Sequence, residues 1–128
     1  MAHLGGRGEF LTGSFFERVP EGADTYILKN VLHDWPDDKC AAILNNCRAA
    51  IPARGKLLLI ERVMPAHINS SHRHQALAYA DLTMLIGPGG CERTEMEFRA
   101  LLGTAGFSVT RVVETTLVFS VVEAVAKP

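Results

Sequence analysis

One stretch decides the fold and carries the first candidate for chemistry: Tyr26-Ile27-Leu28-Lys29-Asn30-Val31-Leu32-His33-Asp34-Trp35. Its first part is mostly apolar and short enough for a buried strand of about residues 24–32. Pro36 and two aspartates follow. This order is typical of a helix start, because proline fixes φ for the first turn and acids favour the positive end of the helix dipole. His33 and Asp34 are therefore predicted to lie on the turn between a strand and a helix.

A second buried strand, Lys56 to Val63, is predicted after a helix of about residues 37–50. Both strands are continuously apolar, which is typical of strands buried on both faces of a parallel sheet. Strand, helix and strand then form a βαβ unit, which is almost always right-handed. Ligands bind at the carboxyl edge of such sheets, where His33 is expected. The helix carries one apolar stripe, made of Cys40, Ile43, Leu44, Cys47 and Ile51.

The flanking segments complete an α/β pattern. Upstream, residues 9–12 could form a short strand, and residues 14–22 a loop or one helical turn. Downstream we expect a polar loop from Pro65 to His74, a helix over 75–86 stopped by a Gly-Pro-Gly-Gly run, and a helix beginning at the capping box of Thr94 and Glu97. The last helix has a buried stripe of Phe98, Leu101, Leu102 and Ala105, with Gly106 as its C′ residue. Two strands, 107–114 and 117–126, should pair antiparallel.

Composition limits the classes of partner. The 128 residues are 48% hydrophobic and 21% charged, enough for one domain with a real core. The net charge of -1 indicates no nucleic-acid partner. No apolar run approaches the roughly 20 residues that span a bilayer, and the N-terminus lacks the features of a signal peptide, so we expect no membrane association and a cytoplasmic location.

The cysteines and the clustered histidines indicate no metal site. Cys40, Cys47 and Cys91 show no CxxC spacing, so reduced thiols are expected. Three histidines at positions 67, 72 and 74 lie in one polar segment, but no Cys, Asp or Glu joins them between Pro65 and Gln75. A solvated loop is the favoured interpretation.

Four segments, in this order and spacing, resemble a known family: GSFFERVPEGAD, LKNVLHDWPDD, GKLLLIERVMP and GGCERTEMEFRALLGTAGF. Over about residues 8–126 the chain looks like the C-terminal part of an S-adenosylmethionine-dependent O-methyltransferase of the plant caffeate-type and bacterial polyketide-tailoring group. The resemblance implies a partial Rossmann-like class I methyltransferase sheet with flanking helices and a C-terminal antiparallel strand pair. Residues 1–128 would then lack both the glycine-rich cofactor loop and the N-terminal dimerisation domain. The run at 5–8 is no substitute for that loop, because no strand precedes it.

The resemblance also implies catalytic roles. Methyl transfer from a sulfonium needs donor and acceptor held in line and the acceptor's proton removed. His33 matches the family's general base, and histidine suits this step because its ordinary pKa lies near neutrality. Glu61 and Glu92 match glutamates that flank and orient it. The alternatives are a histidine that merely ends a strand, a solvated Glu61, and a Glu92 paired with Arg93.

Binding residues follow from the same resemblance. S-adenosylmethionine would contact Ser14, Phe15 and Lys29, although the family usually has aspartate where Ser14 stands. Phe15 could equally be a core aromatic, and Lys29 could extend from a strand edge to solvent. A small hydroxylated acceptor would contact three residues, Asp34, Met84 and Leu85; Asp34 could instead cap a helix, and the other two could be helix core. The family chemistry needs no metal.

Three functions stay open at this stage. The first is methyl transfer to an aromatic or polyketide hydroxyl. The second is a relative that has drifted to hydroxylation or decarboxylation, and the third is a non-catalytic fragment that self-associates. In the family sheet, the strand at 24–32 is central, and its partner strand is missing here. We therefore expect a homo-oligomer joined near Tyr26, Ile27 and Leu28, unless Phe10 and Leu11 fold back over that edge.

Overall fold

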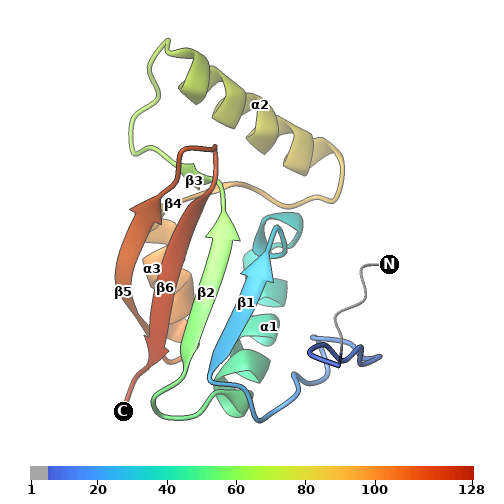
Figure 1. Cartoon of the computed structure of the whole chain (residues 1–128). Helices are drawn as coiled ribbons and strands as arrows, with labels where there is room; N and C mark the ends of the chain where they lie inside the picture. The colour runs from blue at the N-terminus through green and yellow to red at the C-terminus, as the bar shows by residue number, and fades with distance from the viewer. Residues whose placement is uncertain (1–5) are drawn as a thin grey trace.

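A computed structural model describes residues 6–128 and shows a four-stranded mixed sheet with helices on one face (Figure 1). Residues 1–5 lie outside the described residues, and so does most of the N-terminus at which the sequence predicts no signal peptide. The sheet order is β1-β2-β6-β5, and β3 and β4 form a separate short parallel pair. The strands are β1 (Thr25–Lys29), β2 (Lys56–Glu61), β3 (Val63–Met64), β4 (Arg93–Thr94), β5 (Phe107–Glu114) and β6 (Ser120–Ala126). The helices are α1 (Asp37–Ala50), α2 (His72–Ile86), α3 (Glu95–Thr104) and a 3₁₀ turn, η1 (Leu32–Asp34).

The predicted βαβ unit is present. β1 and β2 pair in parallel, from Thr25 opposite Lys56 to Lys29 opposite Ile60, and α1 makes the crossover. β6 runs antiparallel to both β2 and β5, which confirms the predicted C-terminal strand pair and makes the sheet mixed. The carboxyl ends of β1 and β2 therefore meet at one edge, below α2 in Figure 1.

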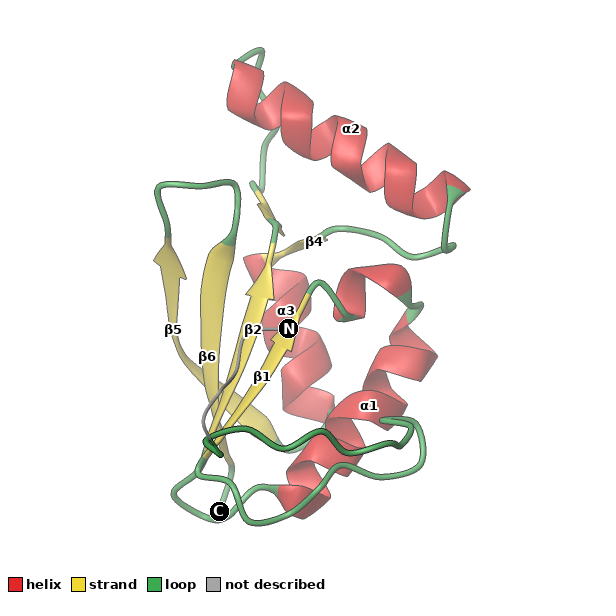
Figure 2. Cartoon of the chain, turned by 45° about the vertical axis from the view of Figure 1, so that its right-hand side comes forward, coloured by secondary structure: helices red, strands yellow, loops and turns green. Residues whose placement is uncertain are grey.

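Helices α1 and α3 cover the same face of the sheet, as Figure 2 shows from the side. Both predicted apolar stripes are buried there and form one core with β2 and β6. β2 alternates, however, with Leu57 and Leu59 fully buried toward the helices and Leu58 and Ile60 only half-buried on the other face. The expectation of burial on both faces is therefore wrong for the described chain, because no helix of it covers the second face.

Several boundaries differ from the predicted ones for local reasons. The strand expected over 24–32 ends at Lys29, because Asn30 adopts a left-handed φ of 54° and η1 follows. Residues 9–12 form no strand. α2 begins at His72 because the Ser71 side chain accepts from the His74 amide and caps it. β2 ends at Glu61, and β6 begins at Ser120.

The α3 prediction is confirmed in detail. The Thr94 hydroxyl accepts from the Glu97 amide, and the Glu97 carboxylate accepts from the Thr94 amide, which is the reciprocal capping box. At the other end, Gly106 follows the C-cap with a φ of +81°, a conformation that glycine adopts without a Cβ penalty. Local sequence therefore sets both ends of the helix that supports β4.

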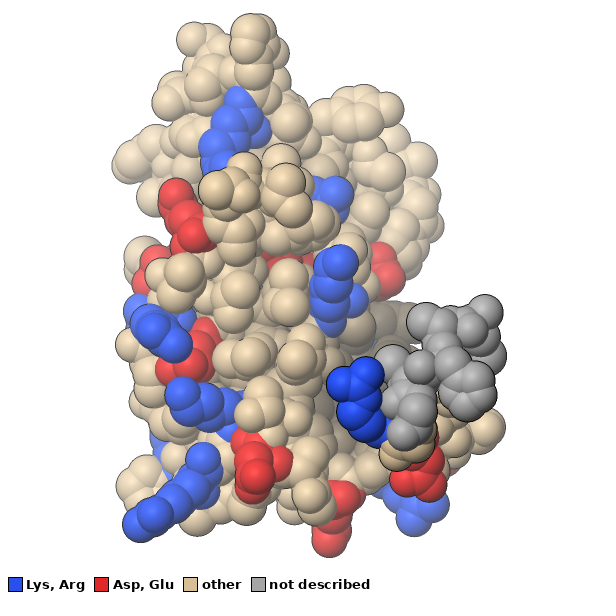
Figure 3. Space-filling view, in the orientation of Figure 1, with Lys and Arg blue, Asp and Glu red and all other residues tan. Residues whose placement is uncertain are grey.

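β1 forms one open edge of the sheet. Its only strand partner among the described residues is β2, and Ile27 is 58% exposed. Phe10 and Leu11, which could have covered this edge, are exposed and add no strand. Basic and acidic side chains are interspersed on the face shown in Figure 3. None of the described helices is both long and apolar enough to cross a bilayer.

Candidate active site

His33 lies on η1, at the carboxyl edge of β1, and its side chain is almost fully buried. Its Nδ1 is 3.2 Å from Glu92 Oε1 and 3.8 Å from Glu61 Oε2. Its Nε2 is 3.3 Å from Asp34 Oδ1. The structure thus brings together the three residues predicted for catalysis, and adds Asp34 on the second ring nitrogen.

The carboxylate at Nδ1 decides which ring nitrogen can accept a proton. An ionised carboxylate only accepts hydrogen bonds, so the contact with Glu92 requires Nδ1 to carry the hydrogen. In the neutral imidazole, Nε2 then keeps its lone pair. Asp34 Oδ1 also only accepts, so it pairs with Nε2 once that atom is protonated. The arrangement suits a base that takes a proton at Nε2.

Glu61 is completely buried at the end of β2, so it is not the solvated strand-end residue that was the alternative. Its Oε1 accepts from the backbone amides of Val31 at 3.0 Å and Leu32 at 2.9 Å. Burial raises the pKa of Glu61, while His33 and the two amides oppose that rise. Glu61 therefore holds the chain that leads into η1 as well as facing the imidazole.

Glu92 sits in the segment between α2 and β4, and its carboxylate is fully buried. Its Oε1 also accepts from Arg62 Nη1 at 3.3 Å, and its backbone amide donates to Asp81 on α2 at 2.8 Å. The pairing of Glu92 with Arg93 is not formed, because Arg93 binds Asp37 instead. Sequence reasoning missed both Arg62 and Asp81 as partners of Glu92.

The three side chains around the imidazole could also hold a metal ion by distance. One ligand atom from each of His33, Glu61 and Glu92 lies within 4.8 Å of the others. The second oxygens of the two glutamates are buried and lack a hydrogen-bond partner among the described residues. The guanidinium of Arg62 already supplies positive charge to Glu92, however, and this disfavours a further cation beside that carboxylate.

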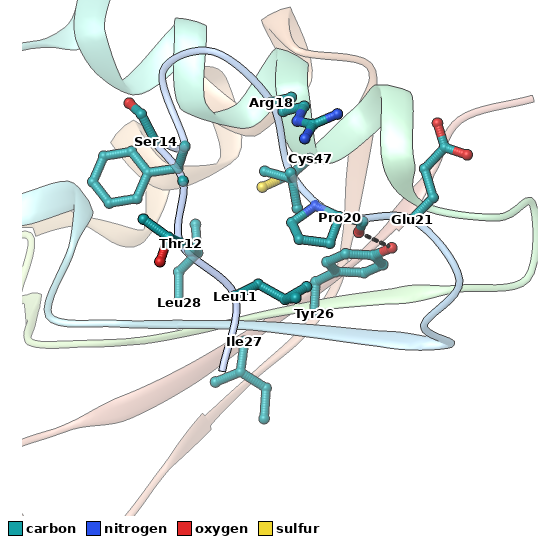
Figure 4. Close-up of a pocket in the computed structure, with 13 residues that line it drawn as sticks. Leu11, Thr12, Ser14, Arg18, Pro20, Glu21, Tyr26, Ile27, Leu28 and Cys47 are labelled. Carbon is teal, nitrogen blue, oxygen red and sulfur yellow. Dashed lines mark hydrogen bonds between the residues drawn. The ribbon is translucent and has the colours of Figure 1, made fainter. Parts of the chain in front are cut away.

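Ser14 and Phe15 line a cavity of about 710 Å³ beside β1 (Figure 4). The Ser14 hydroxyl accepts from the Phe16 amide, so it also shapes its own turn. Lys29 is not part of this cavity, because its ammonium lies 5.7 Å from the centre of the Phe119 ring. The structure therefore brings together two of the three residues predicted to bind cofactor and separates the third from them.

The three residues predicted to bind the acceptor lie in different surroundings. Met84 is half-buried and lines a hollow of about 320 Å³ together with Arg62 and Leu77. Leu85 is 66% exposed. Asp34 does not cap α1, since Pro36 occupies the N-cap position and no side chain caps that helix. Of the three, Asp34 is the one that contacts His33.

This fold and this sequence have counterparts among known proteins. The O-methyltransferase domain family model matches residues 2–108, so the chain belongs to the O-methyltransferase domain family. It is 48% identical over 111 residues to the O-demethylpuromycin-O-methyltransferase of Streptomyces alboniger, covering 87% of this chain and 29% of that protein. It is 42% identical over 123 residues to a phenazine O-methyltransferase of Lysobacter antibioticus, covering 96% of this chain and 35% of that protein.

Solved structures agree. NcsB1, an O-methyltransferase from neocarzinostatin biosynthesis solved with S-adenosylmethionine and 2-hydroxy-5-methyl naphthoic acid, superposes with a TM-score of 0.83 at 37% identity. That alignment covers 96% of this chain and 34% of that one. The predicted family resemblance and the predicted methyltransferase-type α/β sheet are therefore confirmed. The chain spans about a third of the length of the relatives it matches.

Proposed function

We propose that the chain is the C-terminal part of an S-adenosylmethionine-dependent O-methyltransferase domain, and that it supplies the general base for methyl transfer to a hydroxyl of a small aromatic or polyketide acceptor. One observation carries the proposal: the buried contact of His33 Nδ1 with Glu92, which leaves Nε2 able to take a proton. The relatives named above, which methylate small molecules by name, give the substrate class.

The proposed reaction is an in-line displacement. S-adenosylmethionine, when bound, would supply an electrophilic methyl carbon and a thioether leaving group that keeps the electrons of the carbon–sulfur bond. His33 Nε2 takes the hydroxyl proton of the acceptor, and this frees an electron pair of that oxygen for attack. Glu92 and Glu61 balance the imidazolium on the Nδ1 side, and Asp34 does so on the Nε2 side. General-base action of this kind is worth about 10²- to 10⁴-fold in rate.

The residues present fit only one side of a bound S-adenosylmethionine. The cavity beside β1 has an apolar wall with Phe15, a hydroxyl from Ser14 and a guanidinium from Arg18. Ser14 and Phe15 would hold the cofactor there, and Lys29 would do so only after leaving Phe119. Among the described residues, no glycine-rich loop lies beside β1 to contact the other side of the cofactor. We therefore propose weak cofactor binding by this chain alone.

Self-association is the second candidate, and the open edge of β1 favours it. The backbone groups of β1 that face away from β2 have no strand partner among the described residues, and Ile27 is exposed beside them. Such an edge pairs readily with another strand. We propose a homo-oligomer joined there. We also propose a cytoplasmic location, which the three unpaired cysteines support.

A chimera tests the enzymatic proposal. This chain would replace the corresponding third of the Lysobacter phenazine O-methyltransferase, so that the rest of that enzyme supplies what this chain lacks. We expect methyl transfer above background, together with binding of S-adenosylhomocysteine by calorimetry. A chimera that binds S-adenosylhomocysteine normally but transfers no methyl group to any hydroxylated acceptor of its parent would contradict the proposal.

A further inference from the structure

Arg93 is the buried cation of β4, directly after Glu92, and only 3% of it is exposed. Its Nη1 donates to the Leu32 carbonyl at 2.8 Å, and its Nη2 donates to the Trp35 carbonyl at 2.9 Å. These two carbonyls flank the pair of residues His33 and Asp34. One planar guanidinium therefore spans the turn that carries the imidazole.

The same turn is held from its other side by Glu61, which accepts from the amides of Val31 and Leu32. The Glu61 carboxylate thus binds the backbone amides that enter the turn, and the Arg93 guanidinium binds the backbone carbonyls on either side of it. Cys40 Sγ adds contacts to the same carbonyls, at 3.2 Å to Leu32 and 3.3 Å to Trp35. Burial raises the pKa of Cys40 to about 11, so the thiol remains a neutral donor.

Asp37, in the first turn of α1, fixes the guanidinium itself. Its Oδ1 accepts from Arg93 Nε at 3.1 Å and from Nη2 at 2.8 Å. The Asp37 side chain is 79% exposed, whereas that of Arg93 is buried. Burial acts to lower the pKa of Arg93, but the hydrogen bond and charge of Asp37, together with Cys40 and Cys91, raise it overall. A lysine could offer a charge here, but not this fork of donors.

We infer that Arg93 is a positioning residue for His33, acting through the backbone of η1 and not through the imidazole. Because Arg93 follows Glu92 directly, the segment leading into β4 supplies both the carboxylate that contacts Nδ1 and the guanidinium that holds the backbone of η1. The catalytic importance of this inference rests on the proposed function of His33. Its structural content concerns the imidazole orientation, which can be measured in this chain without any turnover.

The test compares Asp37→Ala with Asp38→Ala. Both positions lie in the first turn of α1 and are exposed, but Asp38 has no hydrogen bond or ion pair among the described residues. Nitrogen NMR of the His33 ring reports its tautomer, and hydrogen exchange reports the Asp34 and Trp35 amides, which bond within the turn. For Asp37→Ala we expect a mixed tautomer and exchange about tenfold faster, the scale of weakening one hydrogen bond to a charged group. Asp38→Ala should match the wild type in both.

Arg93→Lys is the stronger variant and should enlarge both effects. Urea unfolding of each variant separates a local change from global destabilisation, since a purely structural role would speed exchange everywhere by the same factor. The inference is overturned if Asp37→Ala and Asp38→Ala give the same ring spectrum and the same Trp35 exchange. It is also overturned if a folded Arg93→Lys keeps the single wild-type tautomer. Retained turnover on replacing His33 would contradict the proposed base role but would leave these outcomes unaffected, so the two proposals fail separately.

Discussion

Gly90 allows the segment before β4 to lie directly against the η1 backbone, and a single methyl group there should displace it. A Cβ built on Gly90 would lie 1.9 Å from the His33 carbonyl oxygen and 2.6 Å from the Asp34 carbonyl carbon. Side-chain Cβ atoms essentially never come within 3.0 Å of other atoms. In Gly90→Ala, one of the two segments must therefore move by about 1 Å. Both are backbone, so no flexible side chain can absorb the shift.

The magnitude follows from that geometry. Overpacking a well-packed site costs roughly 1–3 kcal/mol, and a clash between two backbones belongs at the upper end. Gly89→Ala is the neighbouring control, because nothing lies within 4 Å of its Cβ and its φ is +82°. It should cost about 1–2 kcal/mol from backbone strain alone. Gly13→Ala has neither clash nor strain and should change stability by no more than about 0.5 kcal/mol.

Urea unfolding followed by the fluorescence of Trp35, the single tryptophan, measures these costs beside the turn itself. Hydrogen exchange of the Asp34 amide then locates them. Gly90→Ala should speed that exchange beyond its global effect, and Gly89→Ala should not. If Gly90→Ala unfolds within about 0.5 kcal/mol of the wild type and leaves Asp34 exchange unchanged, the reasoning about close backbone approach is refuted.

Three further predictions address charge, cofactor and assembly. Burial raises the folded-state pKa of Glu61, so the contribution of Glu61 to stability is greatest at acidic pH and is lost as pH rises through that pKa. Glu61→Gln lacks this titration. Urea unfolding across pH should therefore show that the stability of Glu61→Gln relative to wild type increases as pH rises. An unchanged difference at every pH would contradict this. Calorimetry should detect little or no S-adenosylmethionine binding by the chain alone, and micromolar affinity would overturn that expectation. Ile27→Lys should shift the chain toward monomer in light scattering, whereas a wild type that is already monomeric at high micromolar concentration would rule out the β1-edge oligomer.

Periodicity was enough to predict the parts of the fold that depend on local pattern. The apolar stripe of α1, the capping box of Thr94 and Glu97, and the antiparallel C-terminal strands all follow from spacing and turn chemistry. The extent of β1 did not follow, because a left-handed Asn30 ends the strand early and apolar composition carries no information about that φ. Exposure of the second sheet face was missed for a related reason. Continuous apolar character predicts burial, but it does not identify the element that covers each face of the strand.

The sequence predicted which residues lie together at the site, but not the hydrogen bonds that connect them. The resemblance pointed to His33, Glu61 and Glu92, and the carboxyl-edge rule explains why strand ends bring two of them together. Pairing of Glu92 with Arg93 was the alternative to a role of Glu92 beside His33, and the structure does not form it. Glu92 lies directly before β4 and Arg93 is the first residue of β4; Glu92 reaches the imidazole, whereas Arg93 reaches the turn backbone. Long-range pairings of this kind depend on the tertiary fold, which no local pattern encodes.

The most direct test of the central claim is the turnover of His33→Gln in the chimera, beside His74→Gln as a matched control. His74 is a histidine near the start of α2 whose ring accepts only from the Asn69 amide among the described residues. The account predicts that His33→Gln lowers methyl transfer by about 10²- to 10⁴-fold, with affinity for S-adenosylhomocysteine nearly unchanged, and that His74→Gln does neither. Retention of more than about a tenth of the turnover by His33→Gln would contradict the assignment of His33 as the base, given the usual contribution of such groups.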